Sequence, residues 1–220
     1  MATQRTGTFG SYYGSTTGTS EPLSQSEMDV NAVYVYSYLL DKGWSVNAIS
    51  AMLGNMQAES TINPGRWQSE DVGNTSMGFG LVQWTPSTNY TDWCSEQGYS
   101  DPSEMDNNLS RIIYEVQNKL QWIATETYNY SFETFSKSTD SVLSLAKAFL
   151  LNYERPADQS ESVQNYRSAL GSYYYELLTG SEPSEPSDPE PSEPSTTSSK
   201  KRKFNFILHN ARKRRATWIK

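Results

Sequence analysis

Apolar residues recur with helical spacing through most of the first 180 positions. The clearest stripe follows Ser45, with apolar side chains at i, i+3, i+4 and i+7: Ile49, Met52, Leu53 and Met56. This spacing places them on one face of a helix, and serine is a preferred residue at helix N-termini. Similar stripes predict helices over about 27–42, 88–97, 102–123, 140–153 and 160–178. The pattern therefore predicts six helices.

The segment from Arg66 to Trp84 interrupts this helical pattern. It loses the 3.6-residue period and carries glycines at positions 73, 78 and 80. Glycines at this density favour turns, and a short hairpin is the expected structure. The sequence therefore predicts a mainly helical body with a small β insert.

Composition divides the chain into four segments. Residues 1–22, rich in Gly, Ser, Thr and Tyr, are expected to form a flexible N-terminal segment, and residues 23–180 hold the helical domain. Residues 181–199 contain five prolines and five acids, which predicts a disordered Ser/Pro/Glu linker. Residues 200–220 form a basic tail with nine Lys or Arg and no acid. The formal charge of −7 thus combines an acidic body and linker with a cationic tail.

The scarcity of cysteine and histidine narrows the chemistry. A single cysteine, Cys94, excludes an intramolecular disulfide, and a single histidine, His209, excludes Ser-His-Asp triads and multi-histidine metal sites. We therefore expect no metal or other cofactor, and any catalysis is expected to use carboxyl groups. No apolar run of about 18 residues predicts a membrane-spanning helix, and the N-terminus lacks the apolar core of a signal peptide.

Glu59 is the first candidate for catalysis. It lies three residues after Met56 and continues the apolar stripe at the end of the second helix. Burial and the negative helix terminus both favour the protonated form of a carboxyl group there. A protonated carboxyl is what a general acid needs to protonate a leaving oxygen. The alternative is that Glu59 caps the helix or pairs within the structure.

The run GFGLVQW at 78–84 has the residue types that bind a sugar. Gly80 allows the backbone to approach a ligand closely. Gln83 offers a donor and an acceptor for hydroxyl groups, and Trp84 offers a flat apolar face. The alternative is a packed hairpin with an incidental glutamine.

Four motifs, in matching order, resemble the phage tail lysozyme family: GNMQAES at 54–60, NPGRWQS at 63–69, GNTSMGFGLVQWTP at 73–86 and NYERPA at 152–157. The resemblance covers about residues 24–178 and is strongest to the tail-tip peptidoglycan-degrading proteins of small podoviruses that infect Bacillus. The Glu-Ser and Gly-Leu-Val-Gln pairs also look like motifs of lytic transglycosylases. The resemblance implies an α+β, mainly α, lysozyme-like fold in which about six helices and a small β-hairpin insert flank a cleft.

The resemblance also implies an activity, that of a muramidase cleaving the β-1,4 bond between N-acetylmuramic acid and N-acetylglucosamine in bacterial peptidoglycan. By position in the family motifs, Glu59 is the general acid, and Gly80, Gln83 and Trp84 fall in the substrate-cleft motif. Tyr153 resembles a transglycosylase tyrosine that helps to position the catalytic glutamate. A core aromatic residue is the alternative for Tyr153.

The sequence does not identify the second catalytic carboxylate. Glu70 and Asp71 precede the expected hairpin, but solvated loop acids are the favoured interpretation. Glu154 is a third candidate, for which a structural ion pair with Arg155 is favoured. Glycosidases usually use two carboxyl groups. Hydrolysis, transglycosylation through the substrate's own 6-hydroxyl and a non-catalytic tail or wall-binding module therefore all remain alternatives.

The resemblance implies a virion protein of the phage tail. Such a protein is made in the host cytoplasm and acts on the bacterial cell wall during genome delivery, with other phage tail proteins as partners. An endolysin released at host lysis is an alternative. The podovirus relatives carry a zinc endopeptidase domain after the lysozyme domain, and a single histidine cannot build that zinc site.

The basic tail has an apolar patch, residues 204–208, between two cationic clusters. Cationic segments with apolar residues bind anionic surfaces, so anionic wall polymers or membrane are candidate ligands. The alternative is a disordered tail that contacts the acidic body or linker, and no specific nucleic acid is expected. Binding to wall sacculi across a salt titration, with and without residues 200–220, separates these alternatives.

Overall fold

The computed structural model describes residues 2–182. The basic tail and the linker from residue 183 onward lie outside the described residues, so the expectations for them remain untested. Within residues 2–182, the chain forms seven α-helices and one two-stranded antiparallel sheet. The expected α+β, mainly α class is confirmed.

The elements follow one another from the small sheet to the last helix. The sheet pairs β1 (Thr3–Gly7) with β2 (Gly10–Gly14). The helices are α1 (Gln25–Asp41), α2 (Val46–Ser60), α3 (Thr88–Glu96), α4 (Met105–Asn118), α5 (Phe132–Lys137), α6 (Val142–Phe149) and α7 (Glu161–Thr179). A 3₁₀ turn, η1 (Gln68–Glu70), precedes α3, and a π-helical turn, η2 (Leu150–Glu154), continues α6. No helix between residues 2 and 182 is both long and apolar enough to cross a membrane.

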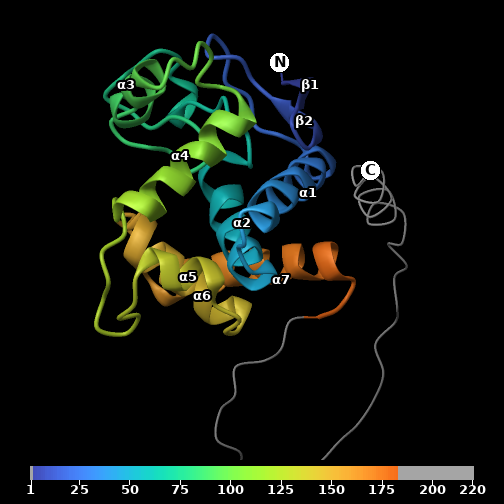
Figure 1. The fold of residues 1–220 in the computed structure, drawn as a ribbon, viewed down its shortest axis with the longest axis vertical. Helices are drawn as coiled ribbons and strands as arrows, with labels where there is room; N and C mark the ends of the chain where they lie inside the picture. Colours follow the sequence, from blue (N-terminus) through green and yellow to red (C-terminus); the bar gives the residue numbers. More distant parts are fainter. Residues whose placement is uncertain (1, 183–220) are drawn as a thin grey trace, which may run out of the picture.

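Helix α2 occupies the centre of the molecule, with α1, α4 and α7 around it (Figure 1). Its N-terminus is capped by Ser45, whose side chain accepts a hydrogen bond from the Ala48 amide at 3.0 Å. The four stripe residues Ile49, Met52, Leu53 and Met56 are all fully buried. The helix, its cap and its buried face are therefore as predicted from the sequence.

Two glycines bring α2 and α7 close together. A Cβ atom on Gly54 would lie 2.4 Å from the Gly171 nitrogen and 2.5 Å from the Arg167 carbonyl oxygen. Both distances are too short for any side chain, so only glycine allows this spacing. Helix α7 is the helix that α2 contacts most extensively. The close contact fixes where α7 side chains lie relative to the C-terminal end of α2.

Residues 1–22 were expected to be flexible, and the structure corrects this for the part it describes. Tyr12 of the β1–β2 hairpin is fully buried, with its ring 5.3 Å from that of Tyr34 on α1. Asn31 of α1 binds β2 through the amide and the carbonyl of Tyr13, both at 2.7 Å. The hairpin is therefore packed onto α1 rather than detached from the body.

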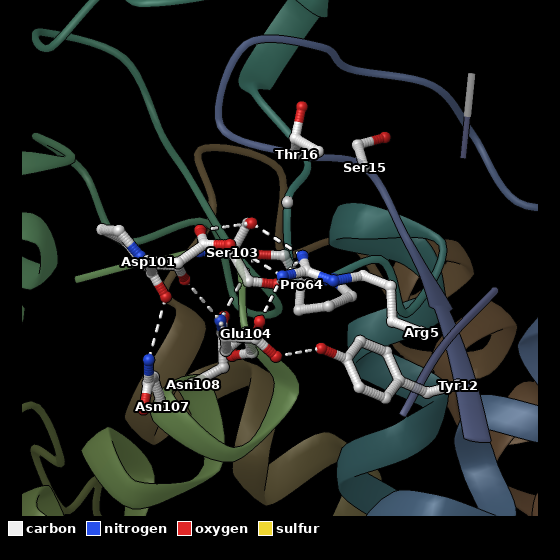
Figure 2. Close-up of polar contacts among 12 residues, drawn as sticks. Arg5, Tyr12, Ser15, Thr16, Pro64, Asp101, Ser103, Glu104, Asn107 and Asn108 are labelled. Atoms are coloured by element: carbon white, nitrogen blue, oxygen red, sulfur yellow. Dashed lines mark hydrogen bonds and ion pairs between the residues drawn. The ribbon is translucent and has the colours of Figure 1, made fainter. Parts of the chain in front are cut away.

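A polar cluster ties the same hairpin to the start of α4 (Figure 2). Arg5 forms an ion pair with Asp101 at 2.7 Å and a second one with Glu104. It also donates to the Ser103 hydroxyl at 2.8 Å, and Tyr12 donates to Glu104. These partners lie almost 100 positions away in the sequence. Local composition therefore gives no indication of this contact.

Two other expectations are changed. The segment from Arg66 to Trp84 holds isolated bridges, in which Phe79 pairs with both Trp67 and Trp84, instead of a hairpin.

Helix α4 ends at Asn118 because Lys119 adopts a left-handed conformation with φ 55°. Leu120 and Ile123, expected on the helix stripe, are therefore outside the helix and exposed. Helix α5, at residues 132–137, was not predicted.

The glycine contact between α2 and α7 predicts that Gly54→Ala destabilises the protein. The added methyl group forces the two helices apart, and overpacking of this kind costs about 1–3 kcal/mol. We expect a lower melting temperature in thermal unfolding followed by circular dichroism. Gly18→Ala is the control, because a Cβ there meets nothing within 4 Å. Equal melting temperatures for the two variants would show that the close approach is not a constraint.

Candidate active site

A polar cleft of about 760 Å³ lies beside the C-terminal end of α2. Three separate stretches of the chain line it, at residues 66–69, 82–85 and 153–157, together with parts of α2 and α4. Its charged lining residues are Glu59, Arg66, Arg111, Glu115, Glu154 and Arg155. Three carboxyl groups and three guanidinium groups therefore meet in one concave site.

Glu59 lies in this cleft on the last turn of α2. The helix ends directly after it, because Thr61 and Ile62 adopt left-handed conformations with φ 55° and 53°. Ser60 is buried and donates to the Leu81 carbonyl oxygen at 2.7 Å, which holds the helix end against the loop that carries Gln83. Glu59 therefore lines the cleft from the C-terminal end of α2, where the sequence places it.

The partner of Glu59 is a cation from α7. Arg167 Nη2 lies 2.5 Å from Glu59 Oε1, and the Glu59 side chain keeps 20% of its surface exposed. Arg167 is itself buried and also donates to Asn55 of α2 at 3.3 Å. Desolvation of Glu59 is the first expectation from the sequence and pairing within the structure is the alternative, and the ion pair with Arg167 matches that alternative.

Gly80 shapes the loop instead of lining the cleft. It adopts a positive φ of 86°, and a Cβ atom there would lie 2.6 Å from Asn108 Oδ1 and 2.9 Å from the Trp84 ring. Only glycine fits both the conformation and the space. Its carbonyl oxygen accepts a hydrogen bond from Gln83, so Gly80 helps to orient the next cleft residue.

Gln83 presents an oriented acceptor at the cleft. Its Nε2 donates to the carbonyl oxygens of Arg66 at 3.0 Å and Gly80 at 2.8 Å, which fixes the side-chain amide. Its Oε1 is buried without a partner within the described residues, as is Nη1 of the cleft residue Arg66. Buried polar atoms are normally hydrogen-bonded. These two atoms are therefore the groups of this wall that a polar ligand or water can satisfy.

Glu115 of α4 joins the two aromatic residues predicted for substrate binding. This carboxylate is 1% exposed and accepts hydrogen bonds from Trp84 Nε1 at 2.9 Å, Tyr153 Oη at 2.6 Å and Arg111 Nε at 2.9 Å. Burial raises the pKa of Glu115, and the hydrogen bonds from Tyr153, Arg111 and Trp84 oppose that rise. The network holds walls from three parts of the chain together.

Trp84 and Tyr153 form the inner layer of the cleft wall. Trp84 is 5% exposed and stacks on Tyr90 at 4.4 Å, and Tyr153 is 1% exposed and stacks on Phe149 at 4.5 Å. The hydroxyl of Tyr153 binds Glu115, whereas the resemblance implied a role beside the catalytic glutamate. Both residues line the cleft, but neither offers a free aromatic face of the size that a sugar ring would cover.

The π-helical turn η2 brings Glu154 into the same cleft. Arg155 ends this turn in a left-handed conformation and donates to the carbonyl oxygens of Gln121 and Asn152, both at 2.6 Å. The expected ion pair between Glu154 and Arg155 is therefore replaced by backbone contacts of the arginine. Glu154 Oε1 is buried and has no hydrogen-bond partner within residues 2–182. Burial raises the pKa of Glu154 well above its usual range, and the charge of Glu59 raises it further.

Glu70 and Asp71 lie outside the set of cleft-lining residues. Glu70 is largely exposed, 3.4 Å from Arg66, and Asp71 accepts a hydrogen bond from Asn74 at 2.7 Å. These contacts are typical of loop acids. No group of three or more His, Cys, Asp and Glu side chains suited to a metal ion occurs in the described part of the chain.

Sequence reasoning missed Glu115 and Arg167. Glu115 carries a usable signal, since it follows Ile112 by three residues and so lies on the buried stripe of α4, as Glu59 does on α2. Arg167 carries a weaker signal, as the lone basic residue of α7. Its pairing with Glu59 depends on the packing of α7 against α2, which periodicity does not specify.

A mainly helical body with one small sheet and an acid-containing cleft beside the central helix defines a lysozyme-like protein. The phage tail lysozyme family matches residues 30–178, and the chain belongs to this family. Over 158 residues it is 52% identical to "Morphogenesis protein 1" of Bacillus phage B103. The match covers 72% of this chain and 42% of that relative, so the chain spans less than half of the relative's length.

The Glu115 network predicts that Tyr153→Phe destabilises the protein. The change removes one donor from a buried carboxyl group, which costs about 1–3 kcal/mol. We expect a lower melting temperature than for wild type. Tyr36→Phe is the matched control, because the Tyr36 hydroxyl makes no hydrogen bond within the described residues and the ring is only partly buried. A loss no larger than that of the control would mean that the hydroxyl is unimportant for the fold.

Proposed function

We propose that this protein is a muramidase that cleaves the β-1,4 bond between N-acetylmuramic acid and N-acetylglucosamine in bacterial peptidoglycan. The observation that carries the proposal is the position of Glu59, a partly exposed carboxyl group in a polar cleft at the end of α2. It lies within the residues that match the phage tail lysozyme family, as do all of the cleft-lining residues.

In the proposed mechanism, Glu59 protonates the glycosidic oxygen as the bond to the sugar breaks. Positioned proton transfer of this kind contributes about 10²- to 10⁴-fold to a rate. Arg167 holds the Glu59 carboxyl group in place and stabilises the carboxylate that remains after proton transfer. Water completes a hydrolysis, whereas the 6-hydroxyl group of the substrate completes a transglycosylation.

Recognition of the saccharide is assigned to the part of the cleft lined by Gln83 and Arg66. The unpartnered Gln83 Oε1 accepts a hydrogen bond from a hydroxyl or acetamido N–H, and Arg66 Nη1 donates to an oxygen of the substrate. Trp84 and Tyr153 line the same cleft and are held in place by their hydrogen bonds to Glu115. The cleft has the volume of a typical ligand site, and its polar lining suits a substrate rich in hydroxyl and amide groups.

The proposed setting is the phage virion. The family is that of phage tail lysozymes, and the relative from Bacillus phage B103 is a morphogenesis protein by name. A tail protein that opens the cell wall locally during genome delivery agrees with both. Its partners would then be bacterial peptidoglycan and other phage tail proteins.

Zymography on Gram-positive sacculi tests the activity. We expect a clearing band for the wild type and a loss of about 100-fold or more for Glu59→Gln, because the amide cannot donate the proton. Glu133→Gln, at an exposed site on α5, is the matched control and should keep full activity. Absence of clearing by the wild type, or clearing that survives Glu59→Gln, would contradict the proposal.

Mass spectrometry of the released fragments identifies the reaction. Hydrolysis leaves reducing ends, whereas attack by the 6-hydroxyl group leaves 1,6-anhydro ends. Products with reducing ends are expected for a muramidase. Anhydro ends would assign the same site to a lytic transglycosylase.

A further inference from the structure

Three glutamates line the cleft, and their carboxyl groups differ in the partners that they contact. Glu59 is bound by the Arg167 guanidinium, and Glu115 accepts three hydrogen bonds. Glu154 makes no hydrogen bond or ion pair through its carboxyl group within residues 2–182, and its Oε1 is buried. Glu154 as a whole is half-buried. A buried carboxyl oxygen without a protein partner is nevertheless costly unless the group is neutral or serves a ligand.

The surroundings of Glu154 favour its neutral form. Burial has the largest effect, and the negative charges of Glu59 on α2 and Glu115 on α4 act in the same direction. The positive charges of Arg167 on α7 and of Arg155 on the same turn oppose them. Neither arginine contacts the Glu154 carboxyl group, because Arg167 binds Glu59 and Arg155 binds backbone carbonyl oxygens.

The pair formed by Glu59 and Glu154 is therefore asymmetric. The Glu59 carboxyl group contacts the Arg167 guanidinium, whereas within residues 2–182 the Glu154 carboxyl group has no cation in contact and its Oε1 is buried without a partner. Environments that push the protonation of two neighbouring acids apart are those that define acid and base roles in an active site.

We propose that Glu154 is the second catalytic carboxyl group of this cleft and that it carries the catalytic proton in the free protein. The inference rests on the proposed muramidase function. With saccharide bound, the proton of Glu154 reaches Glu59 through a water molecule in the cleft, because the two side chains share no hydrogen bond. Glu59 transfers a proton to the glycosidic oxygen as the C–O bond breaks. The attacking water or 6-hydroxyl group then forms the new C–O bond and loses its proton to the Glu154 carboxylate. The pair thus ends with one proton, as it began.

The pH dependence of Glu154→Gln tests the role in catalysis. Glutamine keeps the size of the side chain but neither releases nor accepts the proton, so we expect kcat on soluble peptidoglycan fragments to fall about 100-fold or more with little change in KM. The wild type should lose activity on the alkaline side as Glu154 ionises. The residual activity of the variant should lack that alkaline limb, and the exposed-site variant Glu133→Gln should keep it.

The pH dependence of stability tests the proton on Glu154 without any need for activity. An acid whose pKa is raised by folding stabilises the protein below its unfolded pKa, and this contribution is lost as pH rises through the folded value. Glutamine does not titrate, so the Glu154→Gln variant does not lose this stabilising contribution as pH rises. The melting temperature of the variant relative to wild type should therefore increase between about pH 5 and pH 8, above the ordinary pKa of a glutamate. A second variant, Glu154→Asp, keeps the titration and should lose activity through displacement of the carboxyl group.

The outcomes separate this inference from the function it rests on. Lysis by the wild type that is lost in Glu59→Gln and unchanged in Glu154→Gln overturns the role of Glu154 and leaves the muramidase assignment intact. A melting-temperature difference that does not vary with pH overturns the protonated state of Glu154. Absence of lysis by the wild type overturns the function and the catalytic role together.

Discussion

The contact between α2 and α7 is the constraint on which the cleft depends. Gly54 and Gly171 let the two helices approach until no side chain fits between them. This approach brings Arg167 of α7 to Glu59 on the last turn of α2, at 2.5 Å. A larger spacing would leave a buried guanidinium and a carboxylate without each other, and unpaired buried charges are strongly unfavourable. The packing of α7 against α2 therefore also determines the ion pair in the cleft.

The carboxyl groups of the cleft show how burial and partners divide their roles. Glu115 is almost fully buried but receives three donors, so it serves as a structural link between Trp84 and Tyr153. Glu59 is partly exposed and has one cationic partner, and Glu154 has none in contact. Residue type alone does not distinguish these three glutamates, whereas their partners do.

Much of the helical body could be predicted from the sequence, because its signals are local. The stripe from Ile49 to Met56 and the Ser45 cap define α2, and Glu59 follows from the same period. The N-terminal hairpin could not be predicted in this way, since it is held by contacts such as that of Arg5 with Asp101. The composition of the sequence also gives no indication of the π-helical turn η2. Its extra residue per turn shifts the register after α6 and so brings Glu154 to the cleft.

Net charge describes this cleft poorly. Residues 1–180 carry nine basic and twenty acidic side chains, yet the cleft itself is lined by three glutamates and three arginines. With Arg167 behind Glu59, four of the nine basic residues of the body lie at this one site. The cations are required locally because carboxyl groups removed from water need compensating charge. If the substrate is peptidoglycan, whose stem peptides carry carboxylates, the same arginines also prevent the acidic body from repelling it at the point of cleavage.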